Sequence, residues 1–68
     1  MGKAILLKDL LQLIPTNTEI LIRDEYYTLL FVGTKYNENM CKYEDKLVLE
    51  LDVWDETKLY VRIINNVN

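Results

Sequence analysis

The sequence predicts a small α+β domain in which a short N-terminal helix covers one face of a four-stranded antiparallel sheet. The expected order is α-β-β-α-β-β, and the second helix is short. Residues 6 to 14 carry apolar side chains at helical spacing, whereas residues 19 to 33 and 46 to 64 each contain two alternating runs. Its 68 residues are expected to form one domain, residues 1 to 68.

The first helix is expected within residues 6 to 14. Apolar side chains recur there three and four positions apart and form one face: Leu6, Leu7, Leu10, Leu13 and Ile14. Pro15 disfavours helical geometry in the preceding residue and has no amide to donate, so the helix should end at Ile14. Residues 15 to 18 should then turn the chain.

Residues 19 to 33 predict an antiparallel hairpin. Ile20 and Ile22 should share the core face with Leu29 and Phe31, which pairs Ile22 with Leu29. Residues 24 to 27 are left as the reversal, so two adjacent tyrosines fall where a tight turn normally favours Asn or Gly.

The next segment predicts a short second helix within residues 34 to 45. Gly33 ends the preceding strand, Thr34 is a possible N-cap, and Tyr36, Met40 and Tyr43 follow at helical spacing.

The strongest strand pattern lies in the last third of the chain, where residues 46 to 54 and 59 to 64 alternate. The expected inward side chains are Leu47, Leu49, Leu51, Val53, Leu59, Val61 and Ile63. These faces stay together if Val53 pairs with Leu59, or in a register shifted by two residues, so the loop should be odd in length. A two-residue loop at Glu56 and Thr57 is rejected on this ground. In the allowed registers Arg62 lies opposite Glu50 or Asp52.

Composition excludes several kinds of chemistry. The chain has no histidine and no serine, one cysteine and two glycines, so intramolecular disulfides, Cys/His zinc sites, Ser-His-Asp triads and phosphate-binding glycine loops cannot be built. Paired carboxylates at 24 and 25, 44 and 45, and 55 and 56 are interpreted as solvated turns. Cys41 is expected to be a small core residue. No catalytic residue, metal or cofactor is predicted.

Charge and hydropathy restrict the setting. Eleven acidic against eight basic residues give a net charge of −3 and a pI near 4.7, which disfavours direct binding to nucleic acid. No apolar run approaches the roughly 18 residues of a membrane span. The lone thiol and the lack of a charged-then-apolar leader indicate the cytoplasm.

The outward side of the predicted sheet is more apolar than a solvated face requires. Its members are Leu21, Leu30, Val32, Val48, Trp54, Tyr60 and Ile64. Two explanations remain open. Residues 34 to 45 fold across this face and form a second layer, or the face is an interface with another protein.

Aromatic and acidic residues at the two hairpins form the candidate partner-binding site. Tyrosine and tryptophan concentrate at interface hot spots, and a reversal gains nothing in backbone energy from tyrosine. The alternative is that one of the two adjacent tyrosines caps the core. The candidate set is Tyr26, Tyr27, Asp24, Glu25, Trp54, Tyr60, Asp52, Asp55 and Glu56.

The runs LKDLLQLIPTNTEILIRD and LLFVGT, with KLVLELDV and KLYVRII, resemble a class of short proteins carried by bacteriophages and prophages. The chain departs from that class in its first hairpin, which often turns through Asn-Gly. The resemblance implies a phage-encoded inhibitor of a host protein, similar to anti-CRISPR proteins, whose partner is a host protein such as a CRISPR effector. The alternatives are a self-associating accessory subunit, such as a homodimer, and a weak carboxylate or divalent-metal enzyme.

Overall fold

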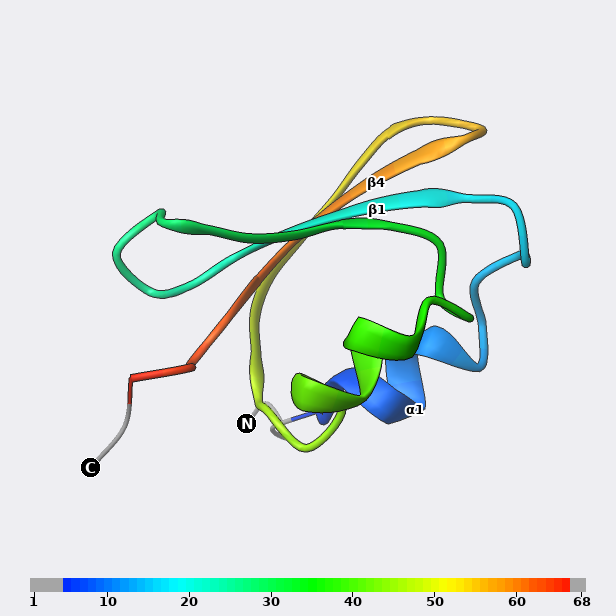
Figure 1. Cartoon of the computed structure of the whole chain (residues 1–68). Helices are drawn as coiled ribbons and strands as arrows, with labels where there is room; N and C mark the ends of the chain where they lie inside the picture. The colour runs from blue at the N-terminus through cyan, green and yellow to red at the C-terminus, as the bar shows by residue number, and fades with distance from the viewer. Residues whose placement is uncertain (1–4, 67–68) are drawn as a thin grey trace.

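The computed structural model describes residues 5 to 66 and confirms the α+β class (Figure 1). A four-stranded sheet forms one layer, and two short helical segments form the other. In chain order the elements are α1 (Leu7–Leu11), β1 (Glu19–Arg23), β2 (Leu29–Gly33), the 3₁₀ helix η1 (Glu38–Lys42), β3 (Val48–Asp55) and β4 (Lys58–Ile63).

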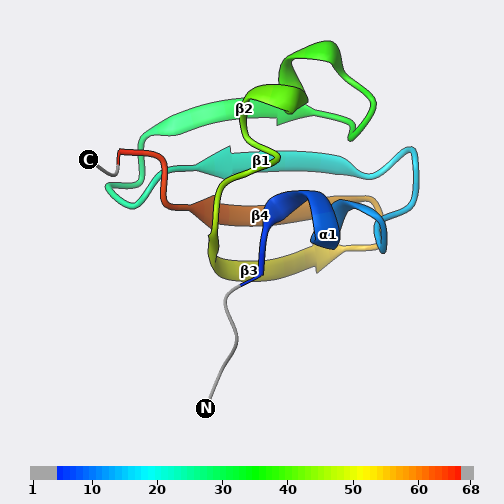
Figure 2. The same ribbon diagram turned by 90° about the horizontal axis from the view of Figure 1, so that it is seen from below.

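The sheet is mixed, which corrects the prediction that it is wholly antiparallel. Its order is β2-β1-β4-β3, as Figure 2 shows, and the central strands β1 and β4 run parallel. Both hairpins are antiparallel. The segment after β2 crosses the sheet and starts β3 in the direction of β2, so the second hairpin returns β4 parallel to β1. Hairpin patterns in the sequence do not contain this information.

Both helical segments lie on the same side of the sheet (Figure 1). We call this side the inner face and the opposite side the outer face. Met40 of η1 is buried in the same apolar cluster as the α1 leucines, and the Tyr43 hydroxyl donates a 3.3 Å hydrogen bond to the Leu30 carbonyl. The prediction that residues 34 to 45 could cover the outer face is therefore wrong, because this segment completes the inner layer.

The second helical segment also differs from its prediction in detail. It is a 3₁₀ helix capped by Asn37, whose side chain accepts a 2.9 Å hydrogen bond from the Asn39 amide, and Thr34 is not the cap. Tyr36 is exposed, and so is Cys41, which was expected in the core.

The first helix is shorter than expected and turns a different set of leucines inward. After Leu11 the amides of Leu13 and Ile14 bond to carbonyls three residues back, so the last turn tightens. Ile14 is thereby buried and Leu13 is 79% exposed, although both were predicted to face the core. Leu6 precedes the helix and forms a bridge with Leu47.

The core lies between the central strands and the two helical segments. Phe31 and Tyr43 add an aromatic contact with ring centroids 6.4 Å apart. Burial of this apolar set supplies the main stabilisation of so small a domain. Its buried apolar members are Leu7, Leu10, Leu11, Ile14, Ile20, Ile22, Phe31, Met40, Leu59, Val61 and Ile63.

An irregularity in the first hairpin overturns its predicted register. Ile22 pairs with Phe31 and Arg23 with Leu29, so one extra residue, Leu30, is accommodated in β2. Leu30 packs against the core, whereas Leu29, which was expected to be buried, is 52% exposed.

The second hairpin keeps the expected core register only from Glu50 to Val53. An irregularity at Leu49 pairs Val48 with Ile63, so Val48, which was expected on the outward side, packs against the core. Val53 pairs with Leu59 and Glu50 with Arg62, as predicted. The two-residue turn at Glu56 and Thr57, which the pattern excluded, is nevertheless present. Trp54 is an extra residue in β3 without a partner in β4, so Val53 can still pair with Leu59.

Strand β3 is an edge strand rather than a central one. Three of its residues that were expected in the core are exposed, and so is Leu47, which precedes the strand: Leu47, Leu49, Leu51 and Val53.

The fold predicts opposite outcomes for two truncations. Val61→Ala should lower the free energy of unfolding by about 2 kcal/mol, because Val61 is fully buried in a central strand. Leu49→Ala should cost about 1 kcal/mol or less, because Leu49 lies half-exposed on the edge strand. Urea denaturation of both variants checks this, and equal losses would contradict the edge position of β3.

Candidate functional site on the outer face of the sheet

The outer face carries apolar and aromatic side chains beside charged ones, and no described element covers it. Pairing across the four strands sets Val32, Leu21, Tyr60 and Asp52 in one row. The neighbouring row contains Leu29, Arg23, Arg62 and Glu50. Directly paired residues point to the same face, so the sheet register assembles this surface from all four strands.

A stacked aromatic pair marks the β3 side of the outer face. The rings of Trp54 and Tyr60 are parallel to within 2°, with centroids 5.7 Å apart. Trp54 occupies one of the two irregular positions of β3, where a bulge redirects a side chain. Trp54 is 54% exposed, so the pair presents a rigid, partly apolar surface to solvent.

Arg62 connects this surface to the first hairpin turn. Its Nε donates a 2.9 Å hydrogen bond to Glu50 Oε1, and its Nη1 lies 3.4 Å from the Glu25 carbonyl oxygen. Its guanidinium carbon lies 4.5 Å from the centre of the Tyr27 ring. The hydrogen bond to Glu50 raises the pKa of Arg62. The arginine thus holds Tyr27 against the sheet.

The first turn explains how tyrosine is accommodated there. The Asp24 amide donates to the Thr28 carbonyl and the Tyr27 amide to the Asp24 carbonyl, both at 3.0 Å, which closes a loop of residues 25 to 27. Tyr27 has a φ of 68°, in the left-handed region where three-residue hairpin loops usually place glycine. Both tyrosines are exposed, so neither caps the core.

The buried carboxylate of Asp24 holds this turn together by hydrogen bonds. Asp24 is 4% exposed, and its Oδ1 accepts hydrogen bonds from the amides of Tyr26 at 2.8 Å and Thr28 at 2.9 Å. Asn66 Nδ2 donates to Oδ2 at 2.8 Å. Desolvation acts to raise the pKa of Asp24, but these three hydrogen bonds together outweigh it and lower the pKa. Asp24 is therefore a turn residue and does not present its carboxylate to a partner.

The Glu25 carboxylate binds residues Asn65 and Asn66, which follow β4, to the same turn. Its Oε1 accepts a 2.9 Å hydrogen bond from the Asn65 amide, and its two carboxylate oxygens lie 3.3 and 3.2 Å from the Asn66 amide nitrogen. The bond from Asn65 is the main reason that the pKa of Glu25 is lowered. Its carboxylate is thus occupied within the chain.

The remaining acidic candidates lie toward the opposite end of the sheet. Asp55 Oδ1 accepts from the Thr57 amide at 2.7 Å and from its hydroxyl at 2.9 Å, and the amide bond in particular lowers the pKa of Asp55. Glu56 is exposed in the turn itself, and Asp52 is exposed opposite Tyr60. Figure 2 shows the two hairpin turns at opposite ends of the sheet, so the predicted residues do not form one cluster.

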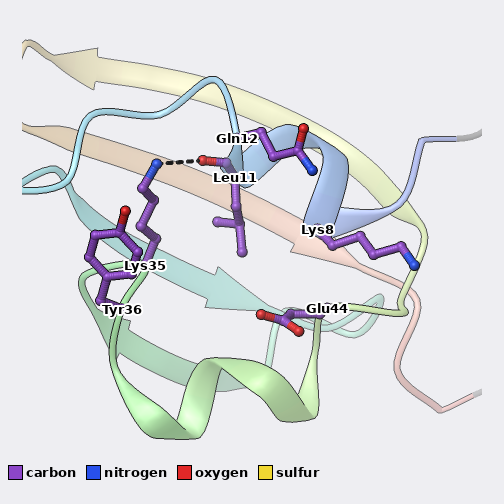
Figure 3. A pocket seen from close by; sticks show the side chains of 6 residues that line it. All are labelled: Lys8, Leu11, Gln12, Lys35, Tyr36 and Glu44. Atoms are coloured by element: carbon purple, nitrogen blue, oxygen red, sulfur yellow. Dashed lines mark hydrogen bonds between the residues drawn. The ribbon is translucent and has the colours of Figure 1, made fainter.

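A polar pocket of about 310 Å³ lies on the inner side and is shown in Figure 3. Lys35 reaches across it and donates a 3.0 Å hydrogen bond to the Leu11 carbonyl at the end of α1, which also accepts from the Ile14 amide. The Lys35 ammonium also lies 5.5 Å from the centre of the Tyr36 ring. Lys35 therefore has a structural role, and the residues that line the pocket include no nucleophile paired with a base. The lining residues are Lys8, Leu11, Gln12, Lys35, Tyr36 and Glu44.

Within residues 5 to 66, no three His, Cys, Asp or Glu side chains gather to hold a metal ion. The helices in that range are all too short or too polar to cross a membrane. Comparison of the chain with protein-family models, curated proteins and solved structures finds no match.

Several outer-face residues were absent from the predicted site. Arg62 was assigned only a cross-strand ion pair, and Leu29 was assigned to the core. Leu21 and Val32 were recognised as outward apolar residues, and that alternation was the available signal. No sequence signal indicated the contact between Arg62 and Tyr27, because this contact depends on the parallel pairing of β1 with β4.

The carboxylate network predicts a loss of stability in acid. In the folded protein the pKa values of Asp24 and Glu25 lie below their ordinary 3.8 and 4.5. Their contribution to the free energy of unfolding is therefore complete above the ordinary pKa values, and it is lost as the pH falls through the pKa values of the folded state. Asp24→Asn should therefore lower stability at pH 7 and flatten its decline between about pH 5 and pH 2. Denaturant titrations across this range measure both effects. Asp52→Asn is the matched control and should follow the parent curve.

The positive φ of Tyr27 predicts a difference between two small substitutions. Tyr27→Gly and Tyr27→Ala both remove the ring, but glycine should give a protein about 1 kcal/mol more stable, because alanine keeps the left-handed strain. Tyr26→Asn combined with Tyr27→Gly should leave stability within about 1 kcal/mol of the parent. Denaturation midpoints test both statements, and equal midpoints for the glycine and alanine variants would contradict the strain.

Proposed function

We propose that this protein is a non-enzymatic protein-binding module and that the outer face is its recognition surface. The observation that carries the proposal is the position of η1. Because this segment packs on the inner side with α1, the outer face with its apolar and aromatic side chains has no cover among residues 5 to 66. An uncovered face of this kind on a small domain is typical of an interaction site.

The composition of the outer face supports a protein partner. Trp54, Tyr60 and Tyr27 are aromatic side chains held in fixed positions, two by stacking and one by Arg62. Such preorganised aromatic residues lose little conformational entropy on binding and are enriched at hot spots. Glu50 neutralises Arg62, and the chain is acidic overall, which disfavours nucleic acid as the ligand.

The more specific form of the proposal is an inhibitor encoded by a phage or prophage that acts in the host cytoplasm. It binds a host protein of defence or nucleic-acid processing, such as a CRISPR effector. This form is supported by the resemblance in sequence pattern, by the acidic charge and by the absence of catalytic groupings in the described part of the chain. The surface acts by occupying a site that the target needs for its own substrate.

Variants of the outer face test the proposal. Immobilised protein is used to capture partners from a bacterial lysate, and captured proteins are identified by mass spectrometry and purified. Trp54→Ala combined with Val32→Ala should weaken binding to the purified partner by roughly thirtyfold, which corresponds to about 2 kcal/mol.

Tyr36→Ala is the control, because Tyr36 is exposed on the inner side. It should bind as tightly as the parent. Equal affinity of the double variant and the parent would overturn the outer face as the recognition surface. Light scattering of the free protein adds a second check, since a stable homo-oligomer disrupted by Trp54→Ala would assign the face to self-association.

A further inference from the structure

An apolar groove of about 360 Å³ lies on the inner side, between the end of α1 and strand β3. Leu10, Ile14 and Leu59 form buried parts of its lining, whereas Leu51 and Val53 remain 47% and 66% exposed. Leu13 borders the groove and is 79% exposed. The groove is separate from the outer face, because Leu51 and Val53 pair with Val61 and Leu59, which point to the core.

The groove runs beside a strand edge that is unpaired over most of its length among residues 5 to 66. β3 ends the sheet, and Figure 2 shows it at the margin. In the described chain, the other side of this strand is paired at its start, where Leu6 bridges Leu47 and Val48 donates to the Ile5 carbonyl. From Leu49 to Asp55 no described strand pairs with that side. A free edge beside an apolar groove is the arrangement that accepts an added strand, with alternate side chains entering the groove.

Charge decides what kind of strand fits. Glu50, Asp52 and Asp55 lie on the outer side of β3, and Glu56 follows in the turn. A second copy of β3 paired antiparallel about Leu51 would set Glu50 opposite Asp52, and pairing about Asp52 would set its two copies against each other. Like charges directly opposite destabilise a strand pair. Glu50 is already paired with Arg62, and Asp55 accepts hydrogen bonds from Thr57. The exposed Asp52 carboxylate favours lysine or arginine on an added strand.

We propose that the β3 edge from Leu49 to Asp55 binds an extended partner segment in which apolar and basic residues alternate. The apolar side chains of the segment occupy the groove beside Leu51 and Val53, and its basic side chains face Asp52. This inference rests on the proposed function as a protein-binding module and adds to it a contact surface at the β3 edge, which meets the outer face at Asp52.

Two peptides of identical composition test the pairing. One alternates lysine and valine over eight residues, and the other has four lysines followed by four valines. At 150 mM salt the alternating peptide should bind about tenfold more tightly, because only its side chains match the period of a strand. Hydrogen exchange should then slow at amides within Leu49–Asp55 and stay unchanged in β2. Equal binding of both peptides, or protection elsewhere, would overturn the proposal.

Two variants assign the contacts. Leu51→Ser should weaken binding of the alternating lysine-valine peptide by about tenfold. Asp52→Lys should shift the binding preference toward a peptide that alternates glutamate and valine. Both positions are exposed, so the fold should tolerate the changes.

Sedimentation of the free protein adds a third result, since a dimer that protects these same amides would assign the edge to a second copy and overturn the partner segment. The outer-face residue Val32 supplies an independent test, because it lies on β2 at the opposite edge of the sheet. Loss of capture in Val32→Ala with no peptide binding would leave the proposed function intact and reject the edge inference alone.

Discussion

The parallel pairing of β1 with β4 joins two hairpins that would be marginal alone and places the most buried side chains at the centre of the sheet. Ile20 and Ile22 lie beside Leu59 and Val61, and both helical segments cover this centre. β3 is left at an edge by the same arrangement. Because β1 and β4 are the central strands, the β3 leucines are exposed beside a groove. The same arrangement leaves the outer face open.

Arg62 shows how the outer face is preorganised. Its position on a central strand brings Glu50 of β3 and the Tyr27 ring of the first turn to one guanidinium. The first turn is held in addition by the Asp24 and Glu25 carboxylates, which bind the chain after β4. The surface is thus fixed by contacts between the two hairpins, and a partner would meet side chains whose positions are already set.

Two irregular residues resolve apparent conflicts between pattern and turn. Trp54 allows a two-residue turn to coexist with the pairing of Val53 and Leu59, and its ring then stacks on Tyr60. Leu30 shifts the first hairpin so that Phe31, rather than Leu29, pairs with Ile22. In both hairpins the bulge changes which side chain reaches the outer face, so the alternation rule fails where it matters for recognition.

The sequence by itself determined the strand segments, the inward positions of Ile20, Ile22, Leu59, Val61 and Ile63, and the exclusion of histidine and serine chemistry and of an intramolecular disulfide. Those features depend on period and composition, which are local. Tertiary structure alone decided the parallel central pair, the side on which residues 34 to 45 lie, the burial of Asp24 and the edge position of β3. Each of these depends on which elements become neighbours in space, and alternation along one strand has the same period at the centre of a sheet as at its edge.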